Sequence, residues 1–354
     1  MKWLPDWDRV KGHHVKWWQR DGLVLYLTAP RDEPIEAVPE PAPPPDLRTR
    51  WLDPVYRRQD AEHRLAHTFY AADAFPILLP MIGPGSLGTF LGAEPHFMPT
   101  TVWYEACVTD PESYGPIRFE PNGNRWLDAH LALIDEALAH ADGRYCVGMP
   151  DLIENIDTLA AMRGNEAILL DLVTRPEWVK RSIDQINEAF FASFDLLDDR
   201  LRDADGGNGF VFNIWGPGKT AKVQCDFACM ISPAMFEAFV VPALSAQCDW
   251  LDYSLFHLDG TNAMQHLDAL LAIEGLNAIE WTPQAGRPQG GSPVWYDLYR
   301  RIRAGGKGVQ AVGVKHDEVI PLIEAVGPRG LYIMAAAPDP ATAEALAAQV
   351  EQYR

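Results

Sequence analysis

The chain has 354 residues, of which 47% are hydrophobic and 22% are charged, the balance of a globular protein with a large core. Its 30 basic and 49 acidic side chains give a formal net charge of −19 at pH 7. Nucleic acids and anionic membranes need clustered Lys and Arg, so this charge argues against both kinds of partner. It also disfavours a polyanionic substrate unless a local basic pocket overrides it.

The cysteines and the first residues of the chain indicate a cytoplasmic protein. Five cysteines are an odd number in a long chain, which is not typical of a disulfide scaffold and favours a reducing compartment. Residues 1–18 contain no apolar stretch of the secretory type, and no apolar run reaches the roughly 18 residues of a membrane span. We therefore expect a cytoplasmic location.

Residues 1–75 differ in pattern from the rest of the chain. LVLYLT (23–28) is typical of a strand, the Pro- and Glu-rich stretch 29–46 predicts extended chain, and a helix is predicted over 60–72. We interpret this region as an arm or cap on the main domain, suited to contacting a second subunit in a homodimer. The alternative is a disordered linker.

From residue 76 to 354 the pattern alternates between short apolar strands and amphipathic helices, which predicts an α/β fold of the (β/α)8 TIM-barrel type. Short continuous apolar runs suit strands covered on both faces. Seven strands are predicted, at 77–83, 144–150, 209–215, 253–259, 276–281, 308–314 and 330–337. The eighth is either 101–107 or 221–227, although residues 215–233 favour a long active-site loop or hairpin.

Polar residues near the ends of the predicted strands are the candidates for chemistry, because barrel enzymes place catalytic groups there. His257 and Asp259 are two residues apart and point to one face of a strand, where they could form an acid/base pair or two ligands of a metal. Asp226 and Glu280 are the other catalytic candidates. The alternative is a satisfied internal hydrogen bond with no catalysis and no metal.

Five further residues are candidates for substrate binding. The tryptophans among them could line a pocket for a flat or sugar-like ligand, although core packing is the usual place for this side chain. The candidates are Asp151, Trp215, Asn213, Trp281 and Glu105, the last in the 101–107 segment.

Three segments resemble the uroporphyrinogen decarboxylase and corrinoid methyltransferase superfamily. They are PDLIENIDTLAAMRG (150–164), the run from SPAMFEAFVVP to GLNAIEWTP (232–283), and GLYIMAAAPDPATAEALAAQV (330–350). The likeness covers roughly residues 75–354 and implies a (β/α)8 barrel. It leaves the reaction open, because the superfamily holds both decarboxylases and methyltransferases.

Two departures from the superfamily bear on the reaction. The Arg-rich segment that holds the carboxylates of a porphyrinogen is absent, so uroporphyrinogen decarboxylation is not expected. The zinc methyltransferases use a His-x-Cys motif and a later Cys near the last strand. Here His257 matches the His, Asp259 stands at the first Cys, and Ala335, Ala336 and Ala337 occupy the last strand. A soft, thiolate-rich zinc site is therefore replaced by a harder donor set.

The resemblance favours methyl transfer from a small substrate, assisted by zinc or another divalent metal at His257 and Asp259, with a corrinoid on a partner protein as acceptor. In this reading Asp226 and Glu280 orient the substrate. A lyase or decarboxylase, or a glycoside hydrolase acting on a sugar-like substrate through Asp226, Asp259 and Glu280, is the alternative. A second alternative is a barrel that has lost its chemistry.

Overall fold

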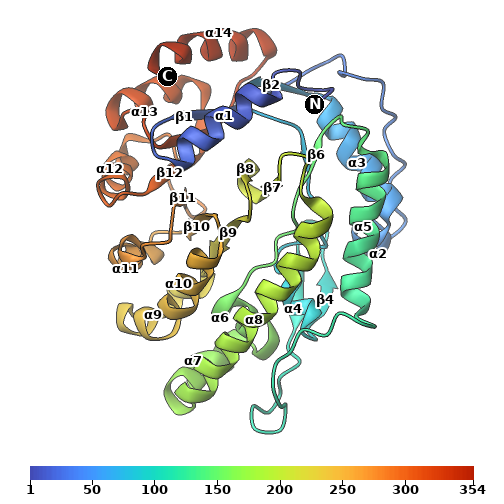
Figure 1. Cartoon of the computed structure of the whole chain (residues 1–354), viewed down its shortest axis with the longest axis vertical. Coiled ribbons are helices and arrows are strands. Elements are labelled where there is room, and N and C mark those ends of the chain that lie inside the picture. Colours follow the sequence, from blue (N-terminus) through green and yellow to red (C-terminus); the bar gives the residue numbers. More distant parts are fainter.

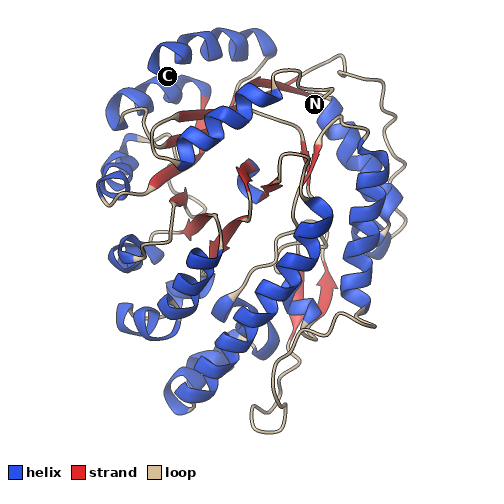
Figure 2. Ribbon diagram, viewed as in Figure 1, coloured by secondary structure: helices blue, strands red, loops and turns tan.

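The computed structural model describes all residues, 1–354, and its centre is a seven-stranded, mostly parallel sheet. Neighbouring strands pair in parallel along the order β1-β13-β12-β11-β10-β9, and β2 closes one edge in the antiparallel direction. The strands are β1 (Leu23–Pro30), β2 (Thr68–Ala72), β9 (Thr220–Gln224), β10 (Tyr253–Asp259), β11 (Ala278–Thr282), β12 (Gly308–Lys315) and β13 (Leu331–Ala336). Helices surround the strands on the outside (Figure 1, Figure 2).

Three two-stranded pairs complete the strand set. β3 (Ile77–Leu78) runs parallel to β6 (Cys146–Val147), whereas β4 (Glu94–Phe97) with β5 (Val102–Glu105) and β7 (Gly207–Phe210) with β8 (Ile214–Pro217) are antiparallel. The Met149 N–H donates to the Gly209 carbonyl at 2.9 Å, which ties the segment after β6 to β7. The α/β class is confirmed and the arrangement is barrel-like, while a closed eight-stranded barrel stays a prediction.

The helices form the outer layer, and two of them begin at caps that the sequence indicates. The Ser232 hydroxyl accepts from the Met235 N–H ahead of α9, and the Asp339 carboxylate accepts from the Thr342 N–H ahead of α14, each with Pro at the first helical position. None of the helices is long and apolar enough to cross a membrane. They are α1 (Trp7–Trp18), α2 (Leu47–Leu52), α3 (Pro54–Ala66), α4 (Ser86–Phe90), α5 (Arg125–Ala141), α6 (Asn155–Arg163), α7 (Asn165–Thr174), α8 (Pro176–Leu201), α9 (Pro233–Phe239), α10 (Val241–Trp250), α11 (Leu267–Ala272), α12 (Tyr296–Ala304), α13 (Val319–Val326) and α14 (Pro340–Val350).

The first 75 residues contribute to the central sheet as well as to its surroundings. β1 pairs with β13 over six residues, and Trp17 on α1 is buried against Tyr332. Of the expected arm, only residues 31–46 are a long segment that forms neither helix nor strand. The division into residues 1–75 and 76–354 stays a prediction. Both parts contribute strands to the central sheet.

The helix predicted over 60–72 is α3 in the structure. It spans Pro54–Ala66, so it both begins and ends earlier than predicted. Pro54 occupies its first position, and the Asp53 carboxylate accepts from the Tyr56 N–H at 2.7 Å, so the helix starts there. The aromatic and β-branched run that begins at Thr68 forms β2 instead, because these residues suit an extended backbone beside β1.

The expectation of a long loop or hairpin over 215–233 is wrong for its middle part. Residues 220–224 form β9, a strand of the central sheet paired in parallel with β10. No helix separates it from β8, because Gly218 at a φ of +85° lets the chain turn directly from one strand into the next. The other proposed strand, 101–107, contributes β5 to a separate hairpin.

Candidate functional site

The register of the parallel strands aligns polar side chains across one face of the sheet. Gln224 on β9 lies opposite His257 on β10, which in turn lies opposite Glu280 on β11. Because side chains alternate along a strand, Asp259 shares the face of His257, and Trp281 points to the other face from Glu280. The sheet therefore brings three of the four predicted catalytic residues to one face.

His257 is held by Glu280. Its Nδ1 hydrogen-bonds to Oε2 of Glu280, and the Thr282 hydroxyl donates to the other carboxylate oxygen at 2.7 Å. Glu280 is buried. Burial of the imidazole acts to lower its pKa, but the charge and hydrogen bond of Glu280 outweigh this and raise the pKa of His257. With Nδ1 engaged, Nε2 is the ring nitrogen left for a ligand or substrate.

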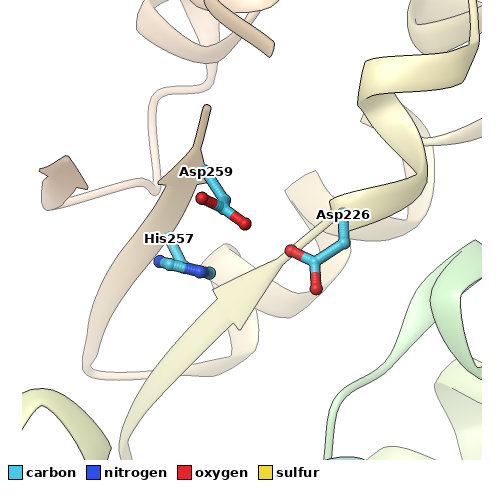
Figure 3. A group of neighbouring side chains, drawn as sticks. All are labelled: Asp226, His257 and Asp259. Carbon is cyan, nitrogen blue, oxygen red and sulfur yellow. The ribbon is translucent and has the colours of Figure 1, made fainter. Parts of the chain in front are cut away.

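Asp226, His257 and Asp259 form the cluster that is central to the site. Each offers a ligand atom, and these atoms lie within 4.8 Å of one another. Figure 3 shows both carboxylates directed toward the space beside the imidazole ring. Partial burial and the negative charge of Asp226 raise the pKa of Asp259, with His257 acting in the opposite direction. Two carboxylates this close repel each other, which a bound cation would relieve.

Asp157 on α6 fixes the backbone that carries Asp226. Its carboxylate accepts from the N–H groups of Asp226 at 2.7 Å and Phe227 at 2.9 Å, and from the Gln224 side-chain amide at 3.1 Å. Burial and the charge of Asp226 raise the pKa of Asp157 to about 6. Sequence reasoning missed this residue, because a polar position on a helix gives no sign of a partner 69 residues away.

A buried ionic network lies next to the cluster. Nζ of Lys222 lies 2.7 Å from Oδ1 of Asp151, and the Glu154 carboxylate accepts from the Gln224 N–H at 2.7 Å. Burial raises the pKa of Glu154 to about 8. Asp151 therefore acts as counter-ion to Lys222, and not as the exposed substrate ligand that its place after a strand suggested. Lys222 was also missed, because its segment was interpreted as a loop.

The two tryptophans predicted to bind substrate belong to the core. Trp281 is buried against Trp295 with ring centroids 4.9 Å apart. Trp215 is also buried, and its indole N–H donates to Asp203 at 3.0 Å. Both predictions are wrong. Trp281 points away from the sheet face that carries His257 and Glu280, and Trp215 is enclosed by its neighbours.

The remaining two substrate candidates are not part of the cluster. Asn213 is at the tip of the β7–β8 hairpin and lines a different cavity, described below. Glu105 is exposed at the end of β5, next to residues that border a cleft. Neither contacts His257 or the two aspartates.

A cleft of about 730 Å³ adjoins the cluster. Asp226 and Asp157 form part of its wall, and the β4–β5 hairpin contributes Trp103 and Tyr104. The Trp103 side chain is 66% exposed, unusual for an indole. The cleft thus combines an acidic corner with an apolar wall, the combination found at small-molecule sites.

The donor set at the cluster fits a divalent cation. Metal-bound histidines commonly use one ring nitrogen for the metal and give the other to a carboxylate, which is the arrangement of His257 and Glu280. One imidazole and two carboxylates suit zinc or a harder ion such as manganese. The cluster contains no thiolate, so it differs from the His-x-Cys zinc site of the zinc methyltransferases.

Comparison with known proteins gives one informative likeness. No protein-family model matches the chain, and no curated protein does. Among solved structures, the chain is similar to a methyltransferase from Methanosarcina mazei, with a TM-score of 0.61 and 11% sequence identity over 98% of this chain and 99% of that one. At this identity the likeness shows a shared fold over the whole length.

Proposed function

We propose that this protein is an enzyme that transfers a methyl group from a small methylated substrate, with a divalent cation held by Asp226, His257 and Asp259. The observation that carries the proposal is the convergence of these three ligand atoms within 4.8 Å beside a cleft of about 730 Å³. Methyl transfer as the reaction draws support from the sequence resemblance and from the fold shared with the Methanosarcina mazei methyltransferase.

Each residue has a defined part in this proposal. Glu280 accepts a hydrogen bond from Nδ1–H of His257, so that Nε2 of the neutral imidazole carries the lone pair toward the cluster. Asp157 keeps Asp226 in place through its two backbone hydrogen bonds. Trp103 and Tyr104 would cover the apolar part of the substrate. A bound cation would supply Lewis acidity toward the heteroatom that carries the methyl group.

The resemblance also implies the methyl acceptor, a corrinoid carried by a separate protein. This part of the proposal is tested by supplying free cob(I)alamin as the acceptor. Zinc- or manganese-loaded protein is incubated with methoxylated aromatics, methylamines and methyl thiols, and methylcobalamin formation is followed by absorbance. We expect turnover of one class, reduced by at least ~10²-fold in His257→Ala, as for loss of a principal active-site group.

The exposed His140 on α5 provides the control, since His140→Ala removes an imidazole far from the cluster and should leave the rate unchanged. Absence of methylcobalamin with every class of methyl donor would count against methyl transfer. Equal rates in His257→Ala and the wild type would count against the assigned site.

Metal-free acid/base chemistry, as in a lyase or decarboxylase, is the second candidate. It is favoured by Asp157, whose pKa of about 6 lets the carboxyl hold a proton near neutral pH beside Asp226. It predicts activity that survives a chelator and is lost in Asp157→Asn. The glycoside hydrolase variant is less favoured, because Glu280, one of its three candidate carboxylates, is buried and hydrogen-bonded to His257 and Thr282.

A further inference from the structure

A second cavity, of about 450 Å³, lies between α3 and the strands β1, β2 and β3. It is separate from the cleft beside Asp226. Its wall contains three arginines and not a single Asp or Glu. In a chain with 49 acidic and 30 basic residues, this composition runs against the charge of the molecule as a whole.

Two of the three arginines are neutralised by their own partners. Arg58 pairs with Glu62 and with Glu136, and Arg64 pairs with Asp60. Arg57 has no carboxylate within 4.0 Å. Its guanidinium donates to the Met81 carbonyl at 3.0 Å and lies 5.3 Å from the centre of the Trp51 ring. The cavity therefore carries one positive charge without a counter-ion.

The rest of the wall divides into a polar part and an apolar part. The side chains of Thr28 and Asn213 line the cavity, and neither makes a hydrogen bond within the protein. Leu65, Leu79 and Leu133 line the other part. One uncompensated cation, two free polar groups and an aliphatic surface describe a binding site for an amphiphilic anion.

We propose that this cavity binds a small molecule that carries one carboxylate on an apolar body, with Arg57 as the counter-ion. A planar guanidinium matches the two oxygens of a carboxylate. A phosphate monoester fits less well, because one of its two negative charges would remain unpaired in a partly buried site. The apolar body would lie against the leucines, with Thr28 and Asn213 binding its polar substituents.

This site lies close to the proposed catalytic cluster yet does not depend on it. Asn213 lines the cavity, while its neighbour Phe212 packs on the His257 ring with centroids 4.8 Å apart. The hairpin tip formed by these two residues therefore stands between the cavity and the cluster. Carboxylate binding is expected whether or not the cluster transfers methyl groups.

The test is calorimetric titration of the full chain with hexanoate and benzoate, compared with hexanol, benzyl alcohol and phenyl phosphate. We expect both carboxylates to bind more tightly than the alcohols and than phenyl phosphate. Arg57→Gln should weaken carboxylate binding by roughly tenfold to a hundredfold, the effect of losing a charge-assisted hydrogen bond, and leave alcohol binding unchanged. Arg57→Lys should retain part of the preference.

Arg64→Gln is the matched control, because Arg64 lines the same cavity but is paired with Asp60. It should change carboxylate affinity far less than Arg57→Gln. If Arg57→Gln does not fold, Asn213→Asp provides a second variant, since the added negative charge in the cavity should weaken carboxylate binding alone.

His257→Ala should leave carboxylate binding unchanged, which separates this site from the proposed function. The proposal is overturned if the alcohols or phenyl phosphate bind as tightly as the carboxylates. It is also overturned if Arg57→Gln binds carboxylates like the wild type, or if no carboxylate binds at millimolar concentration.

Discussion

At the scale of single residues, the site depends on carboxyl groups whose surroundings give each a different task. Glu280 is buried and oriented toward the imidazole of His257, whereas Asp226 and Asp259 are exposed and available to a ligand. Asp157 is hydrogen-bonded to the backbone of Asp226 and Phe227 and holds Asp226 in place. The same functional group therefore orients, binds or anchors according to its burial and its partners.

Removing the Asp157 anchor should affect both stability and binding. The N–H groups of Asp226 and Phe227 donate to different oxygens of Asp157, so Asp157→Asn puts an NH₂ group, which cannot accept, opposite one of them. We expect a loss of about 1–3 kcal/mol in the free energy of unfolding and weaker binding of manganese or zinc. Chemical denaturation and metal titration measure the two effects, with the exposed Asp268→Asn as control. Unchanged metal affinity would contradict a positioning role.

Glu154 should make stability depend on pH. Its pKa is raised from 4.5 in the unfolded chain to about 8 in the folded protein, so its contribution is complete below pH 4.5 and is lost as pH rises through about 8. Glu154→Gln cannot titrate and keeps the acceptor for the Gln224 N–H. We expect the free energy of unfolding of the wild type to fall relative to Glu154→Gln across this interval. Parallel pH profiles from urea denaturation would argue against a protonated Glu154.

At the scale of elements, β10, which follows a helix, could be predicted from the sequence, whereas β9, which follows a turn, could not be distinguished from a loop. The strand predicted at 253–259 is β10 with the same bounds, because an apolar run between two helical patterns has few other interpretations. β9 was left open between a strand and a loop, because only Gly218 and Lys219 separate it from β8. The pairing of β9 with β10 places Lys222 and Gln224 at the site. Because β9 could not be assigned from the sequence, these two residues were not among the predicted site residues.

The turn at Gly218 should therefore tolerate substitution poorly. Gly218 has a φ of +85°, and an added Cβ would lie 2.2 Å from a carboxylate oxygen of Asp252. That carboxylate already accepts from the Lys219 N–H, so it cannot move freely. Gly115 is the matched control, since its φ is +83° and nothing lies within 4 Å of the added Cβ.

Gly115→Ala should lose about 1–2 kcal/mol from its left-handed backbone, and Gly218→Ala should lose clearly more. Thermal or chemical unfolding of the two variants gives the comparison. Equal losses would mean that the contact with Asp252 is relieved without strain.

Some of the site residues could likewise be predicted from the sequence, and others could not. His257, Asp259, Asp226 and Glu280 stand at or next to strand ends in the sequence, and the structure brings the first three together with Glu280 behind the imidazole. The predicted roles of Trp215 and Trp281 required knowing which face each side chain occupies, and a shift of one residue reverses that face. Arg57 lies in a helix whose packing against α5 and β3 is a long-range feature without a local signal.

At the scale of the whole molecule, the two ends of the chain are joined. The Arg354 guanidinium donates to the buried Asp73 carboxylate, which also hydrogen-bonds to His13 and accepts from the Leu25 N–H. One hydrophobic core of 95 buried residues extends from Trp3 to Val350. Residues 1–75 and the rest of the chain should therefore unfold together.

Arg354→Gln tests this coupling. Burial acts to raise the pKa of Asp73, but His13 and Arg354 outweigh it and lower the pKa from 3.8 to about 2. The resulting stability is present above pH 3.8 and is lost as pH falls through about 2. We expect Arg354→Gln to lose about 1–3 kcal/mol at pH 7 and to show a shallower decline in acid. The exposed Arg329→Gln should match the wild type, and two separate unfolding transitions would contradict the coupling.

Elemental analysis determines whether Asp226, His257 and Asp259 hold a metal. Protein is purified without chelator, loaded with zinc or manganese, dialysed and analysed beside His257→Ala and His140→Ala. We expect stoichiometric metal in the wild type and in His140→Ala, and its loss in His257→Ala. Metal-free wild type, or equal metal content in all three proteins, would contradict the metal site and leave the acid/base mechanism of Asp157 and Asp226 as the better account.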